Sequence, residues 1–172
     1  MRRLIARAVI AGALLSPIVL QAQAGPAGAP AAATAHPDFS GTWVLDTTKS
    51  QSPMPLPGTM QIVVAQAANS MKIDRTASTP NGDMSTSTSW TLDGQTSKNT
   101  VTQMGMSIDM NTIANWDGAA LVAKTTADVG GQTLEQTDRW SLSADGKELT
   151  INTDVSAGGQ QMSAKLVLNK KQ

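Results

Sequence analysis

The sequence predicts an all-β fold, an antiparallel up-and-down β-barrel of about 8–10 strands. From Asp38 onward, single apolar residues recur at every second position among abundant Thr, Ser and Val, which is the period of a half-buried strand. Turn signals, most of them containing Gly, recur about every eight to twelve residues, a spacing typical of barrels and sandwiches. No segment beyond Ala24 shows a sustained helical period.

The turns divide this region into about ten strands. The pairs Asp93-Gly94, Asp117-Gly118 and Asp145-Gly146 favour tight hairpins. The expected strands cover residues 39–45, 59–66, 69–76, 84–92, 95–103, 106–116, 119–129, 132–143, 147–155 and 160–168. A meander of this kind leaves two exposed edge strands, and closure into a barrel removes them. A two-sheet sandwich is the alternative.

Residues 1–24 predict a cleaved signal peptide of bacterial type. Three arginines precede an apolar run, and Ala22-Gln23-Ala24 forms a small-x-small cleavage site. An uncleaved anchor is the alternative, but the run of about 13 apolar residues is shorter than the roughly 20 that a spanning helix needs. We therefore expect a periplasmic or secreted protein without a membrane span.

Two regions follow the predicted cleavage site. Residues 25–37 are almost entirely Ala, Gly and Pro and indicate a disordered leader, and residues 38–172 form the barrel domain. The chain has no cysteine, which excludes disulfides and a lipoprotein anchor. Of the 13 basic residues three lie in the signal segment, against 13 acidic residues in all, so the remainder is slightly acidic. Its scattered charges predict no nucleic-acid partner.

Methionines supply the candidate binding face. Even spacing places several of them on one side of a single strand, and Met84 and Trp90 share a face on an earlier strand by the same count. Three interpretations are open: plain core packing, an apolar ligand cavity, or a thioether site for Cu(I). The candidate ligand-binding residues are Met84, Trp90, Met104, Met106, Ile108, Met110 and Trp116.

No catalytic constellation is visible. His36 is the only histidine and is expected to be solvated within the leader, which excludes a His-based triad or a multi-His zinc site. Most acids lie in turns, while Asp109, Glu135 and Asp138 are assigned to outer faces of strands. We expect a protein that is not an enzyme and that uses no cofactor and no metal.

The first predicted strand reads Phe39-Ser-Gly41-Thr-Trp43-Val-Leu45. It resembles the Gly-x-Trp strand of the calycin superfamily, which comprises the lipocalins and fatty-acid-binding proteins, and also a group of uncharacterised secreted bacterial proteins with lipocalin-like barrels. The resemblance implies that Trp43 closes the barrel floor and that Gly41 allows close backbone approach. It also implies a basic residue stacked on Trp43, for which Arg139 is the best candidate.

The same resemblance has departures. Where fatty-acid-binding proteins have a helical lid, this chain has Pro53, Pro55 and Pro57, which do not form a helix. The chain has no tyrosine, so the Arg/Tyr clamp for a fatty acid does not carry over.

The function predicted from the sequence is non-catalytic binding of a small apolar or amphipathic ligand by an exported lipocalin-like barrel. The alternative is an envelope structural or inhibitor-like domain with a protein partner at loop 52–58, where Met54 and Leu56 would form an exposed apolar patch. Copper binding by methionines is the third possibility.

Overall fold

The computed structural model describes residues 36–80, 82–103 and 105–172, which form an all-β fold as predicted. The predicted signal peptide 1–24 and residues 25–35 of the predicted leader lie outside the described residues. The strands are β1 (Gly41–Leu45), β2 (Thr59–Ala67), β3 (Ser70–Thr79), β4 (Gly82–Thr91), β5 (Thr96–Gln103), β6 (Met106–Asp117), β7 (Ala120–Val129), β8 (Gln132–Leu142), β9 (Glu148–Ala157) and β10 (Gln160–Lys170).

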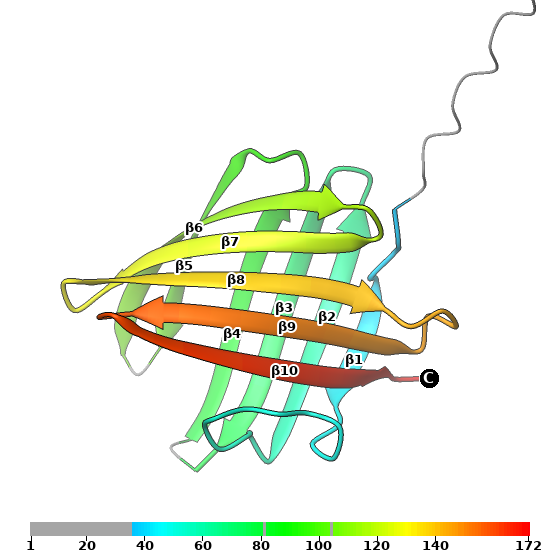
Figure 1. Ribbon diagram of the computed structural model, residues 1–172, viewed down its shortest axis with the longest axis horizontal. Helices are drawn as coiled ribbons and strands as arrows, with labels where there is room; N and C mark the ends of the chain where they lie inside the picture. Colours follow the sequence, from blue (N-terminus) through cyan, green and yellow to red (C-terminus); the bar gives the residue numbers. More distant parts are fainter. Residues whose placement is uncertain (1–35, 81, 104) are drawn as a thin grey trace, which may run out of the picture. The chain divides into compact units, whose positions relative to one another are not determined.

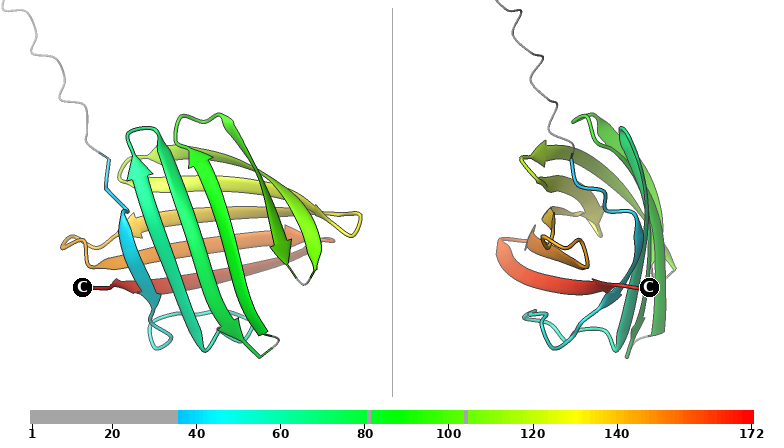
Figure 2. Two further views of the ribbon diagram at one scale, coloured as in Figure 1. Left: turned by 180° about the vertical axis from the view of Figure 1, so that it is seen from behind. Right: turned by 90° about the vertical axis from the view of Figure 1, so that its right-hand side faces the viewer.

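The strands form one continuous antiparallel sheet in the order β4-β3-β2-β1-β10-β9-β8-β7-β6-β5. The first strand, β1, pairs with β2 on one side and with the last strand, β10, on the other. Strands β1–β4 make one face of the molecule and β6–β10 make the opposite face, and the two sets cross at a steep angle (Figures 1 and 2). The predicted up-and-down barrel is therefore confirmed, and the sandwich of two separate sheets is excluded.

The barrel is not fully closed, because β4 and β5 stand at the two ends of the strand order and no backbone ladder joins them. Figure 2 shows β5 diverging from β4. Side chains of β5 bridge part of this seam. The Asn99 side-chain amide accepts a hydrogen bond from Ser89 N at 2.7 Å and donates one to Ser89 O at 3.0 Å. Ser97 Oγ accepts from Thr91 N at 2.8 Å.

One end of the barrel, which we call the floor, is filled by aromatic side chains. Trp90, Trp116 and Trp140 each precede a turn at this end, so the alternation of up and down strands brings them together. Trp90 packs edge-on to Trp140 with ring centroids 5.7 Å apart, and Phe39 lies 5.9 Å from both Trp116 and Trp140. Phe39 and Trp140 are fully buried.

The segment before β1 packs onto the floor, and it includes His36, which is exposed as the sequence predicts. The imidazole stacks on Trp116 with centroids 4.2 Å apart and planes 4° apart. Gln66 ties down the same segment by accepting from Phe39 N and donating to Pro37 O, both at 3.0 Å. Ordered packing thus begins before the predicted domain boundary at Asp38.

The cation on Trp43 is Lys170, and the prediction of Arg139 is wrong. Lys170 Nζ lies 5.2 Å from the centroid of the buried Trp43 ring, whose Nε1 donates to Phe39 O at 2.9 Å. Arg139 falls between inward-facing Asp138 and Trp140 on β8, so it points outward. There it pairs with Asp117 at 2.6 Å.

In the described part of the chain no helix is long and apolar enough to span a membrane.

Candidate functional site: a cavity inside the barrel

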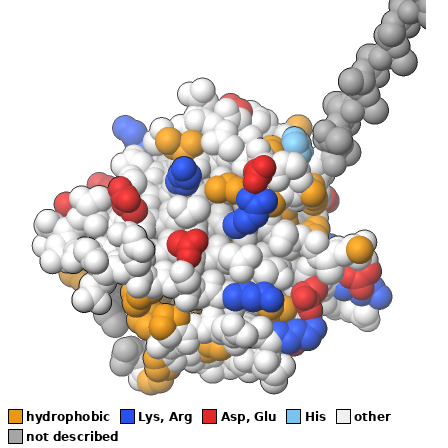
Figure 3. Space-filling model, in the orientation of Figure 1, with side chains coloured by type: hydrophobic (Ala, Val, Ile, Leu, Met, Phe, Trp, Pro, Cys, Tyr) orange, Lys and Arg blue, Asp and Glu red, His pale blue; other side chains and the backbone are white. Residues whose placement is uncertain are grey.

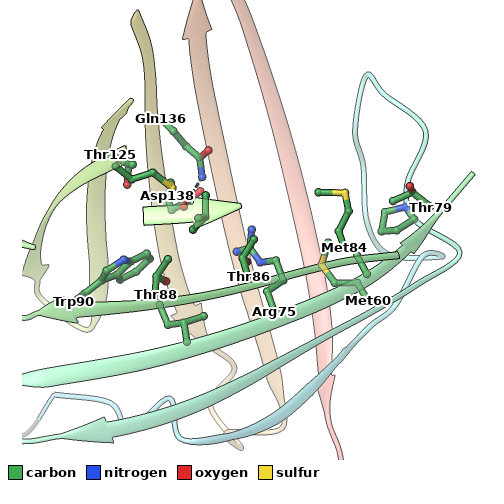
Figure 4. A pocket seen from close by; sticks show the side chains of 15 residues that line it. Met60, Arg75, Thr79, Met84, Thr86, Thr88, Trp90, Thr125, Gln136 and Asp138 are labelled. Carbon is green, nitrogen blue, oxygen red and sulfur yellow. Dashed lines mark hydrogen bonds between the residues drawn. The ribbon is translucent and has the colours of Figure 1, made fainter. Parts of the chain in front are cut away.

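A cavity of about 330 Å³ lies in the barrel interior above the aromatic floor. Strict alternation along β4 forms one of its walls: Met84, Thr86, Thr88 and Trp90 face inward, and the intervening serines are exposed. The opposite wall comes from β6, β7 and β8 through Met110, Thr125, Gln136 and Asp138 (Figure 4). The remaining lining residues are Pro57, Met60, Ile73, Arg75, Ala77, Thr79 and Val101.

Three of the candidate ligand-binding residues, Met84, Trp90 and Met110, line this cavity. The even positions of β6 do share an inner face, with Thr112 and Ala114 buried. The other candidates are not among the lining residues: Trp116 packs in the floor, Ile108 is half-buried, Met106 is 57% exposed, and Met104 lies outside the described residues.

A buried acid belongs to the site, and the prediction that placed it outside is wrong. Asp138 is only 3% exposed and faces inward because it lies two residues before Trp140 on β8. Thr153 Oγ1 donates to its Oδ1 at 2.6 Å, and Gln136 Nε2 donates to its Oδ2 at 2.7 Å. That spacing from Trp140 was the signal in the sequence that could have located it. Asp109 and Glu135 are exposed.

Arg75 is the second charged group on the cavity wall, and it was not among the residues predicted for the site. It shares the inward face of β3 with Met71 and Ile73, and it rises toward the side on which Asp138 and Gln136 lie (Figure 4). Its Nε is buried without a hydrogen-bond partner among the described residues. Arg75 and Asp138 are not within ion-pair distance of each other, although both line the same space.

A second cavity of about 250 Å³ lies beneath the Pro-rich loop 52–58. It shares Pro57, Arg75 and Gln136 with the first, so these residues stand between the two spaces. Leu56 of the loop is half-buried and lines this second cavity, whereas Met54 is 59% exposed. The exposed patch expected around both residues is therefore reduced to Met54.

The end opposite the floor, which we call the mouth, carries acidic side chains at its strand ends, and Lys165 lies in a hollow beside Ser52, Pro53 and Asp154. It holds loop 52–58 and the turns β3–β4, β5–β6, β7–β8 and β9–β10. The four strand residues nearest to each turn include no Lys or Arg. On the face in Figure 3, carboxylates lie at the left, where the β7–β8 and β9–β10 turns are, and Lys and Arg side chains lie among further carboxylates toward the centre and right. The acids of the mouth are Asp83, Asp109, Asp128, Glu135 and Asp154.

The acids of the mouth take no part in the ion pairs found among the described residues. Those three ion pairs are Lys49–Glu148, Lys72–Asp74 and Arg139–Asp117. Within the same residues, no group of three His, Cys, Asp or Glu side chains could hold a metal ion. The Cu(I) interpretation concerns thioethers instead and stays a prediction.

Comparison with known proteins gives matches in structure alone. No family model matches the sequence, and a search of the curated proteins finds no significant match. The structure of zebrafish ileal bile acid-binding protein complexed with cholic acid is 14% identical with a TM-score of 0.49, covering 77% of this chain and 98% of that one. The secretory abundant heat soluble protein 4 of Ramazzottius varieornatus is 16% identical with a TM-score of 0.49, covering 78% and 95%.

The fold is a ten-stranded, nearly closed antiparallel β-barrel. Its ten strands follow one another around the sheet, and the Gly-x-Trp strand begins at the floor with a basic side chain over Trp43. This is the architecture that the first-strand motif predicts. At these identities the likeness concerns the fold and says nothing about the occupant of the cavity.

Proposed function

We propose that this barrel binds a small apolar or amphipathic molecule in its interior and does no chemistry on it. The observation that carries the proposal is the cavity of about 330 Å³ between the aromatic floor and the mouth. Met60, Met84, Met110 and Trp90 give it apolar walls, and thioether side chains adapt readily to the shape of a guest. A few convergent polar groups on an apolar wall are typical of ligand pockets.

A matched pair of substitutions on β4 tests the proposal. Thr86 faces the cavity and its neighbour Ser85 is exposed, so Thr86→Phe fills the space while Ser85→Phe adds the same ring outside. Binding is followed by the fluorescence of N-phenyl-1-naphthylamine, a neutral apolar dye. We expect saturable binding by wild type and Ser85→Phe, and at least about tenfold weaker binding by Thr86→Phe. Circular dichroism confirms that both variants fold.

Two results would contradict interior binding. The first is a wild-type protein that does not bind the dye or any member of a panel of neutral amphiphiles. The second is equal binding by the two phenylalanine variants, which would place the dye on the surface.

A protein partner at loop 52–58 is the second candidate function. It is favoured by Met54, whose side chain is 59% exposed at the tip of this loop. Replacing Met54 by Ser removes the apolar contact and leaves Leu56 in place. If the loop binds a partner, the variant should lose a protein that wild type captures from its own extract, and dye binding should persist.

Export is a further proposal, and it rests on the sequence of residues 1–24 alone. Expression of the full chain in a bacterium should give a mature protein that begins after Ala24. N-terminal sequencing of the periplasmic and cytoplasmic fractions decides this. A full-length protein confined to the cytoplasm would contradict it.

A further inference from the structure

The cavity wall carries one cation and one acid, whereas a site for an anion would carry an excess of positive charge. Arg75 and Asp138 are the two charged side chains that line the main cavity, so its wall has no net formal charge. A site built for a carboxylate would place a cation without a buried acid beside it, because like charges in an apolar interior repel strongly. We propose that the cavity selects a neutral amphiphile whose polar group is both a donor and an acceptor, such as a primary amide or an alcohol. This inference rests on the proposed binding function.

Asp138 has acceptor capacity that the protein does not use. A carboxylate offers about four acceptor positions on its two oxygens. Thr153 and Gln136 each donate one hydrogen bond to it. No Lys or Arg among the described residues lies within ion-pair distance. A donor on a ligand would therefore find free acceptor positions on a buried charge, where a hydrogen bond is strong.

Arg75 supplies the hydrogen-bond donor that complements the acceptor Asp138. Its Nε is buried and has no hydrogen-bond partner in the part of the chain that the structure describes, and an unmet buried donor is costly until an acceptor reaches it. The guanidinium rises from β3 toward the side of β8 where Asp138 lies (Figure 4). A group that accepts from Arg75 and donates to Asp138 satisfies both, and an amide or hydroxyl does this without charge.

The mouth adds a barrier to anions. Asp83, Asp109, Asp128, Glu135 and Asp154 lie within four residues of the turns at the mouth, whereas the basic residue placed beside loop 52–58 is Lys165. A predominantly acidic rim lowers the local concentration of anions, above all at low ionic strength. An anionic amphiphile is therefore disfavoured on the way in as well as beside Asp138.

The test compares three probes that share one alkyl chain: decanoic acid, decanamide and decan-1-ol. Each displaces N-phenyl-1-naphthylamine from wild type at neutral pH, where decanoic acid is ionised. We expect the amide and the alcohol to bind at least about tenfold more tightly than decanoate. Decanoate that binds as tightly as decanamide would overturn this inference, while dye binding would leave the proposed function intact. No dye binding at all would overturn the proposed function itself.

Variants assign the preference to the two charged groups. Asp138→Asn should strengthen decanoate binding by about tenfold, because the like charge is gone. Asp109→Asn removes the same charge from the exposed face of β6 and should leave the ratio of decanamide to decanoate affinities near the wild-type value at high salt. If Asp138→Asn does not fold, Arg75→Met serves instead, and it should weaken decanamide about tenfold without weakening the dye. An unchanged ratio in the cavity variants would contradict the assignment.

Discussion

Lys170 occupies the space that a side chain at position 41 would need. Its Cε lies 2.8 Å from the point where a Cβ on Gly41 would stand. Gly41 also has a φ of 136°, which L side chains rarely adopt. The glycine therefore lets Lys170 cross the start of β1 and reach the ring of Trp43. This gives the Gly-x-Trp motif a physical reason in this chain, because the glycine makes room for the cation that covers the tryptophan.

Gly41→Ala is accordingly expected to destabilise the barrel by about 1–3 kcal/mol, the usual cost of forcing a residue into a sparsely populated backbone conformation. The midpoint of urea unfolding measures the change. In a Lys170→Ala background the same substitution should cost less, because the close contact is gone and only the backbone strain remains. Equal costs in the two backgrounds would show that Lys170 does not contribute.

The N-terminal segment seals the floor, and Phe39 is its buried anchor. Phe39→Ala removes a fully buried ring that contacts Trp116 and Trp140, and such truncations cost about 3–5 kcal/mol. His36→Ala is the control, because it removes an exposed ring from the same segment. We expect its cost to stay within about 1 kcal/mol. Similar urea midpoints for the two variants would mean that Phe39 does not anchor the floor.

The seam between β4 and β5 depends on the side chain of Asn99. Asn99→Ala deletes both of its hydrogen bonds to Ser89, so the Ser89 amide loses its acceptor. Amide exchange followed by NMR should accelerate at Ser89 while the β7–β8 ladder keeps its protection. Asn111→Ala, on the exposed face of β6, is the matched control and should leave the Ser89 amide unchanged. If Ser89 exchanges at the wild-type rate in Asn99→Ala, the side chain does not hold the seam.

The strand pattern could be predicted from the sequence because alternation and turn chemistry are local. The Asp-Gly pairs marked three of the four turns at the floor, and the even register of β6 placed Thr112 and Ala114 inside as their spacing requires. The side chains of a strand point alternately to two faces, so one buried tryptophan in a strand determines the orientation of its neighbours.

The two charged residues of the cavity wall do not follow from alternation alone, because a charged side chain in a strand is more often exposed than buried. Asp138 faces inward with Trp140, but its charge led to the prediction of an outer face, and Arg75 faces inward with Ile73. That both line one cavity depends on how β3 and β8 face each other across the barrel, and local patterns do not contain that information. The choice of Lys170 over Arg139 likewise required the pairing of β1 with β10.

Acid should weaken the fold through Asp46. Its pKa is held below its ordinary value by hydrogen bonds to the carboxylate, first from the Thr48 hydroxyl at 2.6 Å and then from Asn169 at 3.1 Å. A carboxyl whose pKa is lower in the folded state stabilises the protein above its unfolded pKa. That contribution is lost as the pH falls through the folded pKa, so it should fade below about pH 4.

Two variants separate this effect from the general acid sensitivity of the chain. Asp46→Asn removes the titrating group, so urea midpoints should fall less between neutral pH and about pH 3 than they do in wild type. Thr48→Val keeps the carboxylate but removes the hydroxyl that lowers its pKa most, and the acid-induced loss should then be smaller than in wild type because the folded and unfolded pKa values lie closer together. Unaltered pH dependence in both variants would show that Asp46 does not couple protonation to folding.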